Sequence, residues 1–273
     1  MSSRVQECKQ KNLINPPKFL PDNLMYEVLT GSAAYGVSSN TSDMDICGFC
    51  IPPKTDVFPH LAGHIQGLGK QIQRFNQWQM HHIEDSDRCV SYDFCIYGIV
   101  RFFQLCMENN PNMVDVLFVP ERCILHNTIV GQLVRENRKM FLHKGSYHKF
   151  KGYSYSQLHK MSSKKTEPGS KRHEIRNKYG MDTKFAYHVY RLVGEVEQIL
   201  REGDLTLDRE DRREVMKAIR RGEWTEERLS TYFEQKEKHL EDLYHSSDLQ
   251  YGPSLIIPWA NIPFPLATIG RCW

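Results

Sequence analysis

The sequence lacks any apolar run that approaches the roughly 20 residues a membrane-spanning helix needs. Cysteine is also scarce, since eight in 273 residues are too few for a disulfide scaffold. The opening residues, MSSRVQECKQKN, are too polar for a secretory signal. Apolar (40%) and charged (25%) contents are ordinary, which excludes disordered, collagen-like and coiled-coil chains. We therefore expect a soluble, cytoplasmic protein of one large domain or two small ones.

Neither sign of charge predominates, because 36 Lys and Arg face 33 Asp and Glu. Their distribution is more informative than the net charge of +3. Residues 159–178, called here the basic segment, contain seven Lys or Arg, two His and only two acids. This local excess of five positive charges leaves the rest of the chain at −2. The basic segment is either a solvated loop or a site for phosphate or nucleic acid.

Cys47 and Cys50 form a C-x-x-C pair, but no second pair stands at the spacing of a zinc site. Both lie in the apolar run ICGFCI (46–51), which is typical of a buried strand. Small, buried side chains are therefore favoured over redox chemistry or zinc binding.

The first half of the chain alternates between strand and helix patterns. Residues 1–22 contain three prolines and are expected to form an extended N-terminal arm. A following domain over 23–145 is expected to be α/β (or α+β), because strands and helices alternate in it. The expected elements are strands at 24–30, 43–51 and 90–94, helices at 96–107 and about 127–141, a strand or short helix at 113–119, and a long excursion at 54–88 with room for a hairpin.

From about residue 146 the pattern becomes helical and basic. Residues 184–200 are strongly amphipathic, with one apolar face and a narrow polar stripe beside it. We expect a helical, basic domain over 146–248, followed by a proline-rich tail over 249–273. The apolar face comprises Phe185, Val189, Leu192, Val196 and Ile199, and the stripe comprises Lys184, His188, Arg191 and Glu195.

The strongest motif is Gly31-Ser32 followed, ten residues later, by Asp43-Met44-Asp45. A strand that ends in Gly-Ser and enters a helix points backbone N–H groups and a hydroxyl at an anion such as phosphate. Asp43 and Asp45 are two apart on the next expected strand, so both side chains project from one face. Neighbouring carboxylates repel each other unless a divalent cation lies between them, and Mg²⁺ bound to carboxylates and substrate phosphates is the usual arrangement.

This combination resembles the signature of the DNA polymerase β-like nucleotidyltransferase superfamily. The stretches GSAAYGVSSNTSDMDICGFCIPP, ENNPNMVDVLFVP, HKGSYHKFKGYSYSQLHKM and YGMDTKFAYHVYRL are similar to the YcgL-like predicted nucleotidyltransferases of bacteria and phages. The resemblance covers roughly residues 16–250. After Asp248 the sequence departs from the family, because the four prolines of the tail forbid the charged helix with which relatives continue.

The resemblance implies a polymerase β-like core with a mixed sheet and flanking helices. It also implies Mg²⁺- or Mn²⁺-dependent transfer of a nucleoside monophosphate, from a nucleoside triphosphate such as ATP to an acceptor hydroxyl, with release of pyrophosphate. In the superfamily a third carboxylate on a later strand completes a two-metal site. Asp93 is the first candidate to join Asp43 and Asp45 as a catalytic, metal-binding residue. Asp115, on another expected strand, is the rival, and a ligand from the substrate or an acid within 84–87 is left open.

Gly31 and Ser32 are expected to hold the β- and γ-phosphates. Lys184, His188 and Arg191 follow the spacing i, i+4, i+7 and so share a helix face. They form either a solvated stripe or a set of nucleotide-binding groups that meet triphosphate charge as it develops.

Two adjacent histidines, His81 and His82, lie within the excursion. On a regular strand they would point to opposite faces, so they are not expected to share an ion. Tyr35 and Tyr92 are expected to pack in the core rather than stack on a base.

The acceptor is left open between an RNA 3′ end, a protein hydroxyl and a small molecule. The basic segment favours a polyanion such as tRNA. The alternative is a nucleotide-binding regulatory or antitoxin-like module on the same fold, although the presence of every expected acid favours an enzyme. The sequence indicates no oligomeric state.

Overall fold

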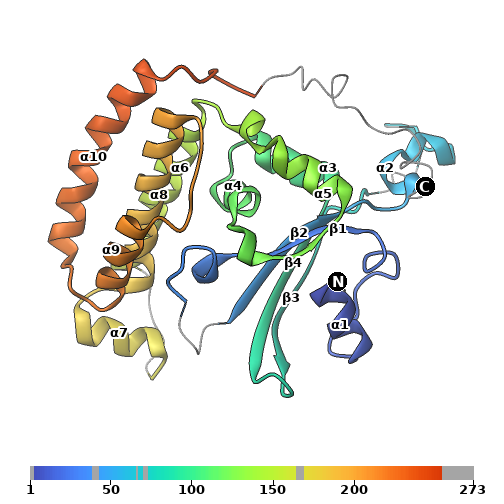
Figure 1. Cartoon of the computed structure of the whole chain (residues 1–273), viewed down its shortest axis with the longest axis horizontal. Helices are drawn as coiled ribbons and strands as arrows, with labels where there is room; N and C mark the ends of the chain where they lie inside the picture. The colour runs from blue at the N-terminus through green and yellow to red at the C-terminus, as the bar shows by residue number, and fades with distance from the viewer. Residues whose placement is uncertain (1–2, 39–42, 66, 70–72, 164–168, 254–273) are drawn as a thin grey trace.

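The computed structural model describes residues 3–38, 43–65, 67–69, 73–163 and 169–253 (Figure 1). Within these ranges, five strands form one sheet in the order β3-β4-β2-β1-β5. The β2–β4 pairing is parallel and the other three are antiparallel, so the fold is α/β with a mixed sheet, as the sequence predicts. The strands are β1 (Leu24–Leu29), β2 (Met44–Cys50), β3 (Gln77–Asp85), β4 (Val90–Gly98) and β5 (Ile124–Asn127).

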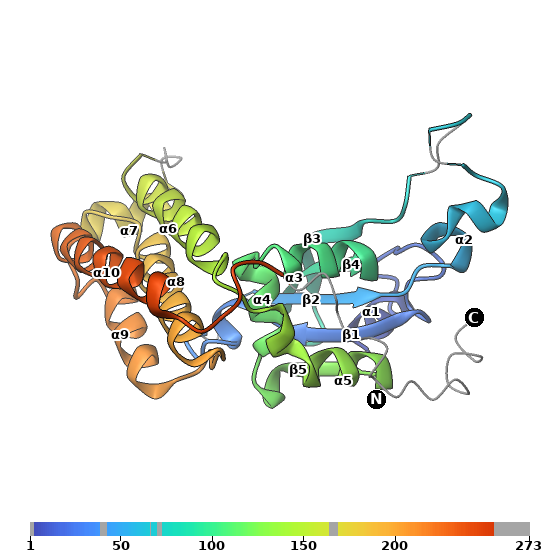
Figure 2. The same cartoon turned by 90° about the horizontal axis from the view of Figure 1, so that it is seen from above.

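Helices cover both faces of the sheet. Helices α3 (Ile99–Met107), α4 (Pro111–Phe118) and α5 (Ile129–Glu136) lie on one face, and α1 (Arg4–Gln10) lies on the other (Figures 1 and 2). Strand β2 contributes to both cores because its side chains alternate. Cys47 belongs to the core under α3–α5 and Cys50 to the core under α1, and both are buried as predicted. Shorter elements are α2 (Lys54–Val57) and the 3₁₀ turns η1 (Gly31–Ala33), η2 (Pro59–Ala62), η3 (Glu121–Cys123) and η4 (Arg138–Phe141).

The extended arm expected over 1–22 is wrong in part, because the arm carries helix α1. Ser3 and Gln6 form a capping box at its first turn. Glu27, fully buried on β1, also accepts backbone N–H groups of this turn, the nearer from Arg4 at 2.6 Å. Burial raises the pKa of Glu27 to about 7. A seven-residue helix is marginal alone, so these tertiary contacts stabilise it.

One boundary in the first half also differs from expectation, and one open alternative is decided. Strand β4 runs to Gly98 because it pairs along its length with both β2 and β3, so the helix expected from residue 96 begins at Ile99. The segment 113–119, expected as a strand or a short helix, is a helix. Its helix starts with Pro111, and the Asn110 side chain caps it.

After α5, five helices of the described chain form a cluster beside the sheet (Figure 2). They are α6 (Ser146–Ser163), α7 (Lys171–Tyr179), α8 (Thr183–Glu202), α9 (Glu210–Arg220) and α10 (Glu226–Ser246). Helix α8 packs against α6, α9 and α10, and every residue of its expected apolar face is buried, which confirms the amphipathic pattern.

Among the described residues, no helix combines the length and apolar character needed to cross a membrane. The predicted tail lies outside the described residues from position 254 onward.

Candidate active site

Asp45 and Asp93 lie side by side on the two central, parallel strands. They are Cα partners in the β2–β4 ladder, and both line a cavity of about 280 Å³. Desolvation raises the pKa of Asp45, Lys184 opposes this rise, and the neighbouring Asp93 and Asp43 add to it. The two strands therefore concentrate negative charge at one place, which favours a bound cation.

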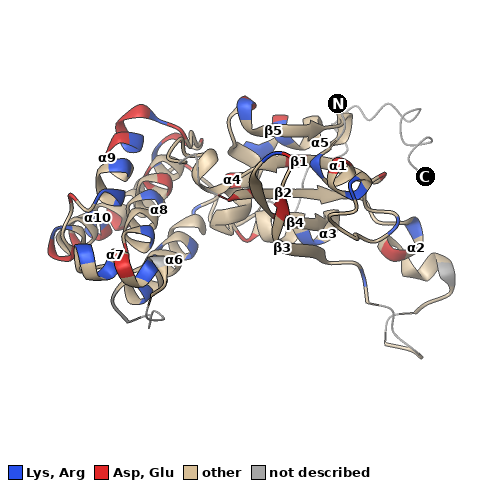
Figure 3. Cartoon of the chain, turned by 90° about the horizontal axis from the view of Figure 1, so that it is seen from below, with Lys and Arg blue, Asp and Glu red and all other residues tan. Residues whose placement is uncertain are grey.

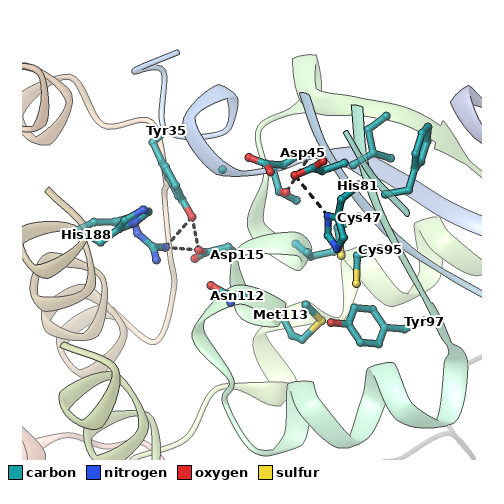
Figure 4. Close-up of a pocket in the computed structure, with 17 residues that line it drawn as sticks. Tyr35, Asp45, Cys47, His81, Cys95, Tyr97, Asn112, Met113, Asp115 and His188 are labelled. Carbon is teal, nitrogen blue, oxygen red and sulfur yellow. Dashed lines mark hydrogen bonds and ion pairs between the residues drawn. The ribbon is translucent and has the colours of Figure 1, made fainter. Parts of the chain in front are cut away.

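The cavity lies between the sheet and helices α4 and α8 (Figure 4). Strands β2, β3 and β4 form one wall, the turn after β1 contributes Gly31 and Tyr35, and α8 forms the opposite wall with His188 and Arg191. Of the predicted site residues, Gly31, Asp45, Asp93, His188 and Arg191 line the cavity. Asp43, Ser32 and Lys184 lie outside this lining, with Asp43 and Lys184 exposed.

Gly31 is required by the approach of Asp45. It begins turn η1 with φ +59°, and a Cβ atom at this position would lie 2.4 Å from Asp45 Oδ2. The Thr30 N–H, one residue earlier, donates to the Asp45 carbonyl oxygen at 2.8 Å. The turn is thus fastened to the second acidic strand, and only glycine allows the backbone to come so close to its carboxylate.

A bulge in β3 directs two groups at Asp93. The register with β4 shifts between Met80 and Ile83, and His82 has φ +56°. The His82 N–H donates to Asp93 Oδ1 at 2.8 Å, and His81 Nδ1 lies 3.5 Å from Oδ2. Only the His81 ring and the His82 backbone reach Asp93, so these contacts agree with the expectation that the two rings do not share an ion, although a bulge replaces regular alternation here. No periodicity in the sequence indicates this bulge.

Asp115, the rival third acid, lies on helix α4 rather than on a strand. It is 2% exposed, forms an ion pair with Arg191, and accepts a hydrogen bond from the Tyr35 hydroxyl at 2.5 Å. Its Oδ1 has no hydrogen-bond partner among the described residues. The charge of Asp115 is thus balanced by Arg191. Asp93, rather than Asp115, is the acid that lies beside Asp45.

Arg191 is buried and bonded to several acceptors at once. Its Nη1 donates to Asp115, to the Tyr35 hydroxyl at 2.7 Å and to both Glu195 oxygens at 3.2 Å. Burial raises the pKa of Glu195 to about 8 against the opposing effect of Arg191. Arg191 therefore joins α8 to α4 and to the turn after β1. Tyr35 is buried as expected, but its hydroxyl also takes part in this network.

His188 and Lys184 present different kinds of groups toward the acids. Burial lowers the pKa of His188 well below its usual value, and the nearby charges of Arg191 and Lys184 lower it further. His188 is therefore neutral near pH 7, with one ring nitrogen able to donate and the other to accept. The Lys184 ammonium is exposed and favours the charged form of Asp45.

The donor set fits a divalent cation that substrate oxygens help to bind. Among the described residues, no group of three or more His, Cys, Asp and Glu side chains converges closely enough to hold a metal ion. The Asp45–Asp93 pair offers carboxylate oxygens from two adjacent strands. Mg²⁺ is usually bound through one or two carboxylates together with substrate phosphates, so this pair suits it.

Two cysteines in the cavity were not singled out as a pair from the sequence. Cys47 and Cys95 are Cα partners on β2 and β4, two residues beyond the acids. The signal was present, since β2 contains Asp-Ile-Cys and β4 contains Asp-Phe-Cys at the same register. Recognising it requires knowing that these strands are parallel neighbours.

A model of the family described as "RlaP: RNA repair pathway DNA polymerase beta family" matches residues 2–245 of the chain. No curated protein matches it. Among solved structures, a nucleotidyltransferase-like protein from Exiguobacterium sibiricum 255-15 is 10% identical. The alignment covers 89% of this chain and 73% of that chain with a TM-score of 0.31, which is too low to support a conclusion.

Proposed function

Because the chain belongs to the RNA repair pathway DNA polymerase beta family, we propose that it is a metal-dependent nucleotidyltransferase. It transfers a nucleoside monophosphate from a nucleoside triphosphate to an acceptor hydroxyl and releases pyrophosphate. The observation that carries this proposal is the register pairing of Asp45 with Asp93 beside the Gly31 turn.

In this proposal Asp43, Asp45 and Asp93 hold Mg²⁺ or Mn²⁺. Bound divalent cations neutralise phosphate charge and lower the pKa of an attacking hydroxyl. The His82 N–H and the His81 ring keep the Asp93 carboxylate in one orientation. Fixed carboxylates reduce the reorganisation needed when the substrate binds, which is how positioning contributes to rate.

The nucleotide is proposed to lie between the sheet and α8. Backbone N–H groups near Gly31 and Ser32 receive the β- and γ-phosphates, and Lys184 offers a mobile positive charge. Neutral His188 offers a hydrogen bond without adding charge. Because Arg191 Nη1 is already bonded to Asp115, Tyr35 and Glu195, we assign Arg191 chiefly to positioning the turn and α8.

The acceptor is proposed to be RNA, with tRNA as one candidate. The RNA repair pathway for which the family is described supports this choice, and so does the basic segment at the end of α6 and along α7. Figure 3 shows lysines and arginines on both helices. Lys164 and Lys165 lie outside the described residues.

The test is incorporation of label from each α-labelled nucleoside triphosphate into a mixed RNA pool, with Mg²⁺ or Mn²⁺. RNase-sensitive, protease-resistant label supports the proposal, and label that only protease removes identifies a protein acceptor. A nucleotide-binding module without turnover is the second candidate, favoured by the lack of three converging donors among the described residues. Metal-dependent nucleotide binding with no incorporation into any acceptor would support that candidate.

A separate test addresses the basic segment. Replacing Lys164, Lys165 and Lys171 with Ala should weaken RNA binding and flatten its salt dependence, because fewer counterions are released. Triphosphate affinity should stay the same. Arg172 is left intact because it lies 3.6 Å from the buried Asp182, which caps α8. Salt slopes that match the wild type would contradict a nucleic-acid role for the segment.

A further inference from the structure

The Asp45–Asp93 pair has a second, parallel pair beside it. Cys47 and Cys95 occupy the next same-face positions of β2 and β4, since residues i and i+2 of a strand share a face. Both line the candidate active-site cavity. In Figure 4 their sulfur atoms lie next to each other in this cavity. The carboxylate pair and the thiol pair thus occupy successive same-face positions of the paired strands β2 and β4.

The two thiols are neighbours and one of them is accessible. The Cys47 and Cys95 sulfur atoms lie next to each other in the cavity (Figure 4), and Gln79 Nε2 donates to Cys95 Sγ at 3.2 Å. Cys95 is half-buried, Cys47 is 6% exposed, and both are free thiols. Cys50 is excluded as the partner of Cys47 because it lies on the opposite face of the sheet.

Strand geometry permits a bond between them but does not favour it strongly. Neighbouring strands lie about 4.8 Å apart, which falls within the roughly 4.4–6.8 Å that separate Cα atoms at disulfides. The Cβ atoms of a disulfide lie closer, at about 3.8 Å, so the bond would draw β2 and β4 together. Strained disulfides of this kind are easily reduced, which suits reversible formation rather than permanent cross-linking.

We propose that Cys47 and Cys95 form a reversible dithiol–disulfide site in the floor of this cavity, with hydrogen peroxide as the oxidant. Cys95 sulfur attacks one peroxide oxygen, the O–O bond breaks, and the leaving hydroxide takes the thiol proton as water. Cys47 sulfur then attacks the resulting sulfenic sulfur, the S–O bond breaks, and a second water leaves with the Cys47 proton. A dithiol reductant restores both thiols by two exchange steps.

The disulfide would change the geometry of the acids. It draws β2 and β4 together two residues from Asp45 and Asp93, so the distance and orientation between their carboxylates should change. Oxidised protein is therefore expected to lose metal-dependent nucleotide transfer. This consequence rests on the proposed function, whereas the disulfide itself does not.

The direct test uses the full chain. Protein is treated with hydrogen peroxide, its remaining thiols are alkylated, and a non-reducing digest is analysed by mass spectrometry. The expected product is a linked peptide pair containing Cys47 and Cys95, two hydrogens lighter than the separate peptides, which dithiothreitol removes. Cys89→Ser removes an exposed thiol in the β3–β4 turn and should leave the link intact. Oxidation of Cys95 to sulfinic acid without this link, or pairing of either cysteine elsewhere, overturns the proposal.

A second measurement tests the consequence for activity. Each protein is its own reference, with transfer measured before peroxide, after peroxide and after dithiothreitol. In wild type and Cys89→Ser, the transfer rate should fall at least about tenfold after peroxide and recover after dithiothreitol. Cys95→Ser should keep its starting rate through the same treatment. Equal, irreversible loss in Cys95→Ser overturns the regulatory role. If the link forms but reduced protein transfers nothing, the proposed function fails while the disulfide site stands.

Discussion

Two pairs of acids lie in or next to the candidate active-site cavity, and they differ in how their negative charge is balanced. Asp115 and Glu195 are buried and share the charge of Arg191. Asp45 and Asp93 are adjacent and repel each other, and no lysine or arginine among the described residues forms an ion pair with either. The contrast separates acids whose charge is balanced by an arginine of the chain from a pair that suits the divalent cation we propose.

The largest effect is expected when Asp45 or Asp93, which form no ion pair with a lysine or arginine among the described residues, is neutralised. Asp93→Asn and Asp45→Asn should each reduce transfer by roughly a thousandfold or more, because metal and phosphate charge are then poorly held. The melting temperature should stay the same or rise, since a like-charge repulsion is removed. Labelled-nucleotide incorporation at saturating metal, with thermal denaturation, measures both. Asp242→Asn, exposed on α10, is the control. Substantial turnover in either site variant would contradict the metal-binding role.

The next largest effect is a loss of stability when the buried acids Asp115 and Glu195 lose the charge of Arg191. Arg191→Met leaves Asp115 without its cation and should cost about 3–5 kcal/mol in the free energy of unfolding. Arg201→Met, on the same helix but at an exposed ion pair with Glu202, should cost about 1 kcal/mol or less. Urea denaturation provides both values. Combining Arg191→Met with Asp115→Asn should cost less than the two separate changes. Simple additivity would show that the pair is not coupled.

A smaller effect is expected from the protonation of Glu195. Burial raises the pKa of Glu195 to about 8 in the folded protein, above the 4.5 of an exposed glutamate, so the folded state holds more protons between these values. Stability should therefore decrease as the pH rises through this window, by at most about 1.4 kcal/mol per pH unit. Glu195→Gln should flatten the dependence between about pH 6 and pH 8. Unfolding curves with equal pH slopes in both proteins would contradict the raised pKa.

The smallest effect concerns the turn that touches Asp45. Gly31→Ala should cost about 1–2 kcal/mol of stability, because its φ is +59° and the added Cβ would meet the carboxylate. Transfer should also decrease, since Asp45 must move. Gly152→Ala in α6 is the matched control, with nothing within 4 Å of the added Cβ. That variant should gain about 0.5–1 kcal/mol. Equal stability changes in the two variants would show that Gly31 is not strained.

Local patterns revealed the parts of the site that depend on one strand or one helix. Gly31, Asp45 and the face of α8 follow from turn chemistry and periodicity, and Asp93 follows from its place on a strand. Asp115 was a credible rival because its apolar neighbours fit a strand or a short helix equally well. Only its pairing with Arg191, 76 positions away, distinguishes Asp115, whose charge the chain balances, from the acid that lies beside Asp45.

Features that depend on pairing between segments were out of reach. The bulge at His81 exists only relative to β4, and the contact of Cys47 with Cys95 exists only because β2 and β4 are parallel neighbours. The contact of helix α1 with the buried Glu27 was out of reach for the same reason, whereas its capping box of Ser3 and Gln6 was a local signal that went unused.

The buried carboxylate of Glu27 has a consequence for the order in which the chain acquires its structure. Helix α1 precedes the sheet in the chain and is therefore synthesised before it, yet the carboxylate that holds its first turn belongs to the sheet. The sheet in turn needs β4 and β5, which emerge from the ribosome much later. Helix α1 should therefore dock late, onto a sheet that has already formed, although it is synthesised before that sheet.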